Sequence, residues 1–96
     1  MERYYIAAIV ANYDGTIEEC FYAIDGNTCA PYFHSNITNP EVEEFGSLEC
    51  AKEFLKHKYR PINGRLEFIG YAGPTIIGLP YIVKMIPKIE KVYELV

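Results

Sequence analysis

The hydrophobic positions of residues 47–58 follow the period of an α-helix. Apolar side chains recur there at spacings of three and four residues, namely Leu48, Ala51, Phe54 and Leu55. At about 100° per residue they fall on one side of a helix, with charged residues on the opposite side. Ser47 precedes this pattern and is a suitable N-cap. The sequence predicts one main amphipathic helix at about residues 47–58.

Most of the other segments have the pattern of β-strands. Residues 3–13 are nearly all apolar or aromatic, as in a strand that is covered on both faces. Asp14-Gly15-Thr16 is a turn signal, and residues 17–25 resume the strand pattern, so a hairpin is predicted. Further strands are expected at residues 41–45, 65–71 and 81–86.

Three segments are less regular. Residues 28–40 are predicted to form a long loop, with a brief extended piece at residues 31–33. Residues 70–80 combine Gly and Pro with apolar side chains, and they indicate a loop that either covers the core or binds a partner. Residues 87–96 fit both a strand and a helix, and we favour a strand.

Together these segments predict a single α+β domain of residues 1–96. Its expected architecture is a small, mainly antiparallel sheet of four to five strands packed by one main helix. One helix covers only one face of a sheet, whereas the strand at residues 3–13 is apolar on both faces. The second face would be covered by the C-terminal tail, by the loop at residues 70–80, or by a second copy of the chain in a homodimer.

The charge of the chain limits the classes of partner. The net charge is −4 and no basic cluster is present, which argues against direct nucleic-acid binding because phosphates require clustered Lys and Arg. A partner that is itself basic remains compatible with this negative charge. An odd number of cysteines, the absence of a signal-peptide pattern and the short apolar runs predict a cytoplasmic protein without membrane association.

Catalytic and metal chemistry are not indicated by the sequence. Cys29 and His34 lie five residues apart in a predicted loop, while Cys50 and His57 lie two helical turns apart, roughly 10 Å, which is too far for a shared metal or a hydrogen bond. Ser47 is better explained as a helix cap than as a nucleophile. We therefore predict that the protein is not an enzyme, with no catalytic residues, no metal site and no cofactor.

The order of these parts resembles a known group of small proteins. A Tyr-rich opening strand and an Asp-Gly turn precede the helix opening at residues 45–55, and the chain closes with the Ile/Val/Lys/Glu-rich residues 86–95. In these features the chain resembles small α+β proteins of phages and prophages of Gram-positive bacteria. It departs from their pattern by inserting residues 61–80 before the closing strand and by having Cys50 where an acidic residue is more typical. Some small phage proteins bind a host enzyme or sequester a nucleotide signal, and the resemblance implies a function of this kind.

Two functions follow as predictions. The first is a small non-catalytic binding protein that modulates or inhibits a host macromolecule, with a host protein as partner, by occluding its surface. Its expected partner-binding residues are an acidic strip and several apolar or aromatic side chains, namely Glu41, Glu43, Glu44, Tyr71, Ile76, Ile77 and Tyr81. The alternative is a protein that binds and sequesters a small ligand or nucleotide signal, in a pocket between the sheet and the loop at residues 70–80 or between two subunits. Its expected ligand-binding residues are Arg60, Arg65 and Lys84.

Overall fold

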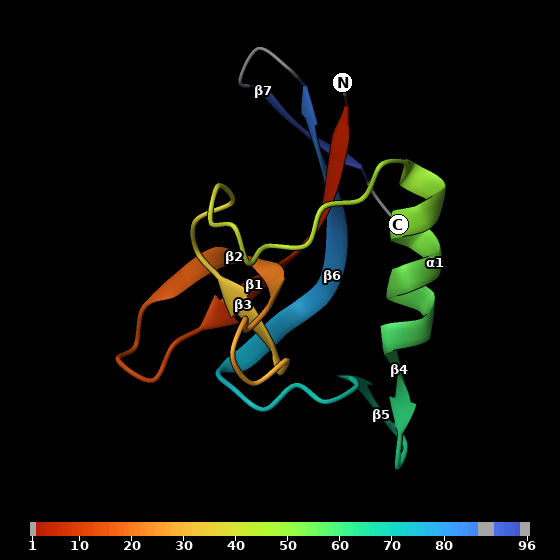
Figure 1. Ribbon diagram of the computed structural model, residues 1–96. Coiled ribbons are helices and arrows are strands. Elements are labelled where there is room, and N and C mark those ends of the chain that lie inside the picture. Colours follow the sequence, from red (N-terminus) through yellow and green to blue (C-terminus); the bar gives the residue numbers. More distant parts are fainter. Residues whose placement is uncertain (1, 87–89, 95–96) are drawn as a thin grey trace.

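The computed structural model describes residues 2–86 and 90–94. These residues form a five-stranded antiparallel sheet, a separate two-stranded sheet and one helix. The predicted α+β fold class is therefore confirmed. Figure 1 shows the helix standing beside the large sheet, with the two-stranded sheet below it.

The elements follow one another in the order β1 (Arg3–Ala11), β2 (Ile17–Ile24), β3 (Pro31–His34), α1 (Leu48–Lys58), β4 (Tyr59–Ile62), β5 (Arg65–Phe68), β6 (Thr75–Ile86) and β7 (Glu90–Glu94). The strand order in the large sheet is β3-β2-β1-β6-β7. The predicted first hairpin, β1–β2, and the brief extended piece, β3, are both confirmed.

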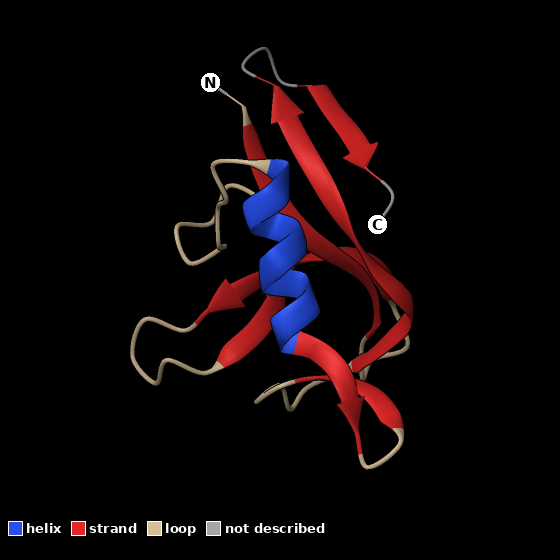
Figure 2. Ribbon diagram, turned by 90° about the vertical axis from the view of Figure 1, so that its right-hand side faces the viewer, coloured by secondary structure: helices blue, strands red, loops and turns tan. Residues whose placement is uncertain are grey.

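Helix α1 has the boundaries that its sequence pattern predicts. The Ser47 hydroxyl accepts a hydrogen bond from the backbone N–H of Cys50 at 3.1 Å, which satisfies one of the unpaired donors at the helix start. Ala51 and Leu55 are buried against the sheet. Figure 2 shows the helix lying across one face of the sheet and passing directly into β4.

The prediction of a loop through residue 80 is wrong, because β6 already begins at Thr75. The residues that suggested a loop lie in a β-bulge: Ala7 pairs with Tyr81 and Ile9 pairs with Ile77, so residues 78–80 lie opposite a single residue of β1. A bulge tolerates a glycine with positive φ, here +73° at Gly78, and a proline that lacks an N–H. The connecting loop is therefore confined to residues 69–74.

The β4–β5 hairpin was predicted only in part. Asn63 and Gly64 have positive φ angles of 51° and 80°, as the Asn-Gly turn of a two-residue hairpin requires. The expected strand at residues 65–71 ends at Phe68, and β4 was not expected, because Arg60-Pro61 gives no strand signal.

Residues 41–45 do not form the predicted short strand. They make two isolated bridges instead, from Val42 to Ala23 in β2 and from Phe45 to Tyr4 in β1. The regular pairing of β1 with β2 ends at Ala7 and Phe21, so this segment contacts both strands where they separate. For the tail, the preference for a strand is confirmed at residues 90–94, which form β7, while residues 87–89 and 95–96 lie outside the described residues.

The two faces of the sheet carry two separate apolar clusters. The cluster between the large sheet and α1 consists of Tyr4, Ile6, Tyr22, Ala51, Leu55, Phe68 and Ile82. The opposite face is formed by Tyr5, Ala7, Phe21, Ala23, Val42 and Val83, with Ile37 packed against it. Val42 and Ile37 belong to the connection between β3 and α1, so part of the second face is covered by a segment that the sequence did not suggest as a cover.

Candidate functional site

The acidic residues that were expected to bind a partner make contacts within the chain. The Glu41 carboxylate accepts a hydrogen bond from the Gly26 N–H at 2.7 Å and another from the Tyr32 hydroxyl. Glu44 pairs with Arg3 and accepts from the Tyr5 hydroxyl at 3.3 Å. These carboxylates therefore hold the segment before α1 against the sheet.

Glu43 is half-buried, and its backbone N–H donates to the Tyr22 carbonyl at 3.0 Å. Burial and, to a smaller extent, the negative charge of Glu43 raise the pKa of the buried Tyr22 hydroxyl. Glu43 therefore also belongs to the packing around the sheet.

The expected apolar anchors lie on two different faces of the sheet. Ile76 is half-buried in the cluster under α1, and Tyr71 packs against the same cluster. Ile77 is the next residue in β6, so its side chain points to the opposite face. Tyr81 shares that face with Ile77 and donates its hydroxyl to Glu19 at 2.5 Å. The structure thus separates these four residues into two pairs.

Ile77 belongs to an exposed apolar region that we call the open sheet surface. It consists of the exposed residues Ile17, Ile77 and Leu79 together with the half-buried Ile9 and Ala11. Ile17, Ile77 and Leu79 are 64%, 45% and 68% exposed. Ile9 pairs with Ile77 and Ala11 pairs with Ile17, so these side chains are neighbours on one face of the sheet.

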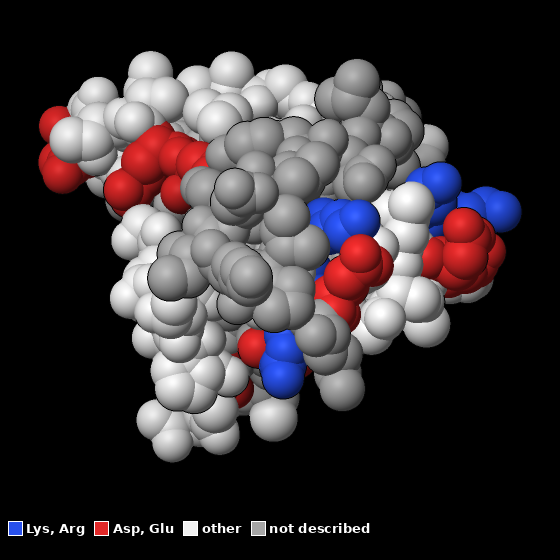
Figure 3. Space-filling model, turned by 90° about the horizontal axis from the view of Figure 1, so that it is seen from above, with Lys and Arg blue, Asp and Glu red and all other residues white. Residues whose placement is uncertain are grey.

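Ile9, Ala11 and Ile17 of the open sheet surface lie in the acidic half of the chain, whereas Ile77 and Leu79 belong to β6. From residue 4 to residue 51 the sequence contains no Lys or Arg but has eight acidic residues: Asp14, Glu18, Glu19, Asp25, Glu41, Glu43, Glu44 and Glu49. The first three of these belong to the β1–β2 hairpin, as Ile17 does. Seen from above, the acidic side chains at the left have no Lys or Arg beside them, whereas those at the right lie next to basic side chains (Figure 3).

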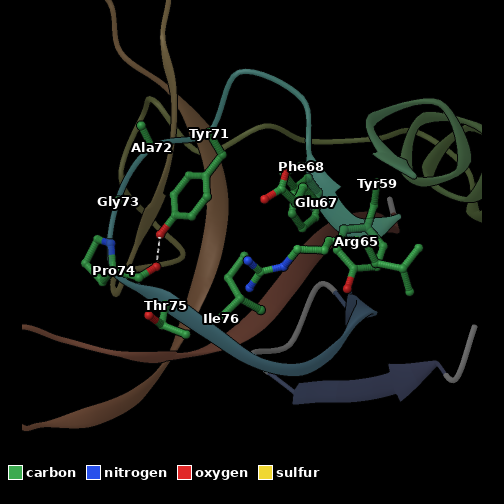
Figure 4. A pocket seen from close by; sticks show the side chains of 11 residues that line it. Tyr59, Arg65, Glu67, Phe68, Tyr71, Ala72, Gly73, Pro74, Thr75 and Ile76 are labelled. Carbon is green, nitrogen blue, oxygen red and sulfur yellow. Dashed lines mark hydrogen bonds between the residues drawn. The ribbon is translucent and has the colours of Figure 1, made fainter. Parts of the chain in front are cut away.

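A pocket of about 310 Å³ lies between the β4–β5 hairpin, the loop at residues 69–74 and the start of β6 (Figure 4). Its lining consists of Tyr59, Arg65, Leu66, Glu67, Phe68, Tyr71, Ala72, Gly73, Pro74, Thr75 and Ile76. The sequence suggested a pocket between the sheet and the segment at residues 70–80, and residues 71–76 of that segment line this pocket together with the β4–β5 hairpin.

Tyr71 is fixed at the wall of this pocket. Its hydroxyl donates to the Pro74 carbonyl at 2.5 Å, and its ring meets the Phe33 ring edge-to-face at 5.3 Å. The ring also lies close to Gly73, where an added Cβ would be only 3.0 Å from the Tyr71 hydroxyl oxygen. A side chain at residue 73 would therefore displace the ring.

The three expected ligand-binding cations are not brought together at this pocket. Arg65 lines the pocket. Arg60 lies opposite Glu67 in the backbone register of the hairpin and is absent from the lining. Lys84 is half-buried in β6 and forms an ion pair with Glu2 at 3.1 Å. Arg65 is thus the member of this set that a ligand in the pocket would meet.

The thiols and imidazoles lie in different surroundings: Cys20 is buried, whereas Cys29 and Cys50 are exposed. Burial raises the pKa of the Cys20 thiol to about 11, which keeps this thiol protonated and unreactive. His57 lies 3.5 Å from Glu53 on the helix surface, and His34 accepts from the Asn36 N–H at 2.9 Å. Among the side chains that the structure describes, no group of three or more from His, Cys, Asp or Glu is arranged to hold a metal ion.

The raised pKa of Tyr71, which lines the pocket, predicts that the protein loses stability at alkaline pH. Burial raises the pKa of Tyr71 to about 12, whereas an unfolded tyrosine ionises near pH 10. Tyr71 therefore makes its full contribution to the free energy of unfolding below about pH 10. This contribution is lost as the pH rises towards the pKa of Tyr71 in the folded state. We expect the free energy of unfolding, measured by urea denaturation, to fall over this range and to fall less steeply in Tyr71→Phe. If the free energy of unfolding falls with pH at the same rate in both proteins, Tyr71 is not the cause of the alkaline loss of stability.

Comparison with known proteins gives no relative of this chain. No family model, no curated protein and no solved structure matches it. The resemblance to phage and prophage proteins therefore stays a prediction. No helix in the described part of the chain is long and apolar enough to cross a membrane.

Proposed function

We propose that the protein is a small non-catalytic binding protein that covers a surface of a partner protein through the open sheet surface. The observation that carries the proposal is the exposure of Ile17 and Ile77 on one face of the sheet, with the exposed Leu79 two residues after Ile77 in β6. A partner that buried them would gain roughly 25 cal/mol for each Å² of apolar surface removed from water. Exposed apolar patches bordered by polar residues are typical of protein interaction sites.

The surrounding charge indicates the chemistry of the partner. Asp14, Glu18 and Glu19 belong to the same hairpin as Ile17, and no Lys or Arg occurs from residue 4 to residue 51. A complementary partner surface would have an apolar centre and a rim of Lys and Arg, as in an enzyme that acts on nucleic acids. Such complementarity increases the association rate and makes it sensitive to salt.

The mode of action would be occlusion. This is supported by the raised pKa of the buried Cys20 thiol and by the local contacts of the imidazoles of His34 and His57, with Asn36 and Glu53. Binding would therefore act by blocking access to the partner. On the resemblance to phage and prophage proteins, we propose a host protein as the partner and the cytoplasm as the location.

The test is capture from a Gram-positive host lysate, followed by affinity measurement with the purified partner. We expect Ile77→Asp to weaken binding about 30-fold or more, because loss of a central apolar contact typically costs about 2 kcal/mol. Leu66→Asp is the matched control, since Leu66 is also an exposed apolar strand residue but lies in β5. The control should bind like the wild type.

Three results would contradict the proposal or part of it. If Ile77→Asp captures the same proteins with unchanged affinity, the open sheet surface is not the interface. If Leu66→Asp alone abolishes capture, the interface lies on the β4–β5 hairpin. An association rate that does not change with ionic strength would refute the basic rim.

A further inference from the structure

We propose that the pocket beside the β4–β5 hairpin binds a compact organic anion that also carries N–H donors, with the size and chemistry of a nucleoside monophosphate. The pocket lies on the other side of β6 from the open sheet surface, because Ile76 lines it whereas Ile77, the next residue, is exposed on the opposite face. This inference therefore does not depend on the docking of a partner protein.

The size of the pocket limits the ligand. Its volume of about 310 Å³ is close to the lower end of the usual range for small-molecule sites, about 300–1,000 Å³. A single nucleotide or a molecule of similar size fits such a volume better than a dinucleotide does.

Arg65 supplies the positive charge. Figure 4 shows the Arg65 side chain extending into the pocket, with its guanidinium directed towards the side where Tyr71 lies. Within the described residues, no carboxylate forms an ion pair with Arg65. A planar guanidinium that is free of a carboxylate partner is suited to bind phosphate or carboxylate through two parallel hydrogen bonds.

Glu67 restricts which anions would be accepted. It lies two residues after Arg65 in β5, so both side chains are on the same face of the strand, and both line the pocket. A carboxylate accepts hydrogen bonds from N–H groups, such as those at the edge of a purine. It also repels additional negative charge, so a monophosphate should bind better than a triphosphate.

Tyr71 and Gly73 give the pocket a wall that is formed before the ligand arrives. The hydrogen bond from Tyr71 to Pro74, the contact with Phe33 and the close approach to Gly73 hold the tyrosine ring in one position. A wall fixed in this way reduces the ordering that binding would otherwise require.

The test uses guanosine 5′-monophosphate as the probe, with inorganic phosphate and guanosine triphosphate as comparisons. We expect the monophosphate to bind with a dissociation constant below about 1 mM in calorimetry, and to bind more tightly than either comparison. Arg65→Gln should weaken this binding at least tenfold. Arg60→Gln is the matched control, because it removes the same charge from the same hairpin outside the pocket lining, and it should leave the affinity unchanged.

A second variant tests the role of the carboxylate. Glu67→Gln should reduce the preference for the monophosphate over the triphosphate, because it removes the repulsive charge from the pocket. The proposal is overturned if the monophosphate does not bind below about 1 mM, if Arg60→Gln weakens binding as much as Arg65→Gln does, or if phosphate alone binds as tightly as the nucleotide.

Discussion

Replacing Tyr22 by alanine is expected to lower the free energy of unfolding by about 3–5 kcal/mol, as for other buried aromatic side chains. Tyr22 is 2% exposed and is among the largest fully buried side chains. Its ring contacts Phe33 of β3, Phe54 of α1 and Phe68 of β5, with centroid distances of 5.7, 5.2 and 5.6 Å. Deleting it would leave a cavity where the helix and both sheets meet.

The loss would remove a large share of the stability of the protein, because small domains are stable by only about 5–15 kcal/mol. Urea denaturation monitored by circular dichroism measures it. Tyr22→Phe retains the ring and should cost much less, and Tyr13→Ala, at an exposed tyrosine, should be nearly neutral. A small effect of Tyr22→Ala together with a similar effect of Tyr13→Ala would show that this aromatic cluster does not stabilise the fold.

The helix and the first hairpin could be predicted from the sequence because local signals determine them. Ser47 caps α1, and the apolar side chains at helical spacing in residues 48–55 leave one buried face. Asp14 accepts hydrogen bonds from the backbone N–H and the hydroxyl of Thr16, at 3.0 and 2.7 Å, which fixes the turn within three residues. Such features do not depend on the rest of the chain.

The start of β6 could not be predicted because tertiary pairing overrides its local signals. Gly78 and Pro80 indicate a break in the strand, but pairing with β1 continues on both sides of them through the bulge. Likewise, β4 is a strand because Tyr59 and Phe68 pair across the hairpin and both pack into the cluster under α1. Neither pairing is visible in a single stretch of sequence.

The candidate sites were predicted residue by residue but not as groups. Arg65, Tyr71 and Ile76 were each selected from the sequence, yet only the hairpin geometry shows that they line one pocket. Ile17 and Leu79 were not selected. Ile17 opens a strand next to two glutamates, and the exposed Leu79 lies within the bulge between Gly78 and Pro80.

Replacing Ala51 by aspartate is expected to cost more than about 4 kcal/mol, because it buries an unpaired charge. Ala51 is fully buried where α1 packs on the sheet, and the atoms around it belong mainly to apolar side chains of the first cluster. The helix would have to leave the sheet to hydrate the new carboxylate. Thermal unfolding should shift downwards by about 4–8 °C for each kcal/mol lost.

Cys50→Asp provides the matched control. It introduces the same side chain one position earlier, at an exposed residue in the first turn of the helix, where negative charge is favourable. It should leave the stability unchanged or slightly raised. Equal destabilisation by both variants would mean that helix propensity, and not packing on the sheet, determines the stability of α1.

Undocking of the helix should also affect the pocket. Lys58 ends α1 and Tyr59 begins β4 without a connecting residue, so displacement of the helix displaces the hairpin that carries Arg65. In Ala51→Asp, measured at a temperature where the large sheet remains folded, binding of guanosine 5′-monophosphate should therefore be lost. Binding of a partner through Ile77 should persist, because that side chain lies on the opposite face from α1. Loss of both activities together would mean that the domain unfolds as one unit.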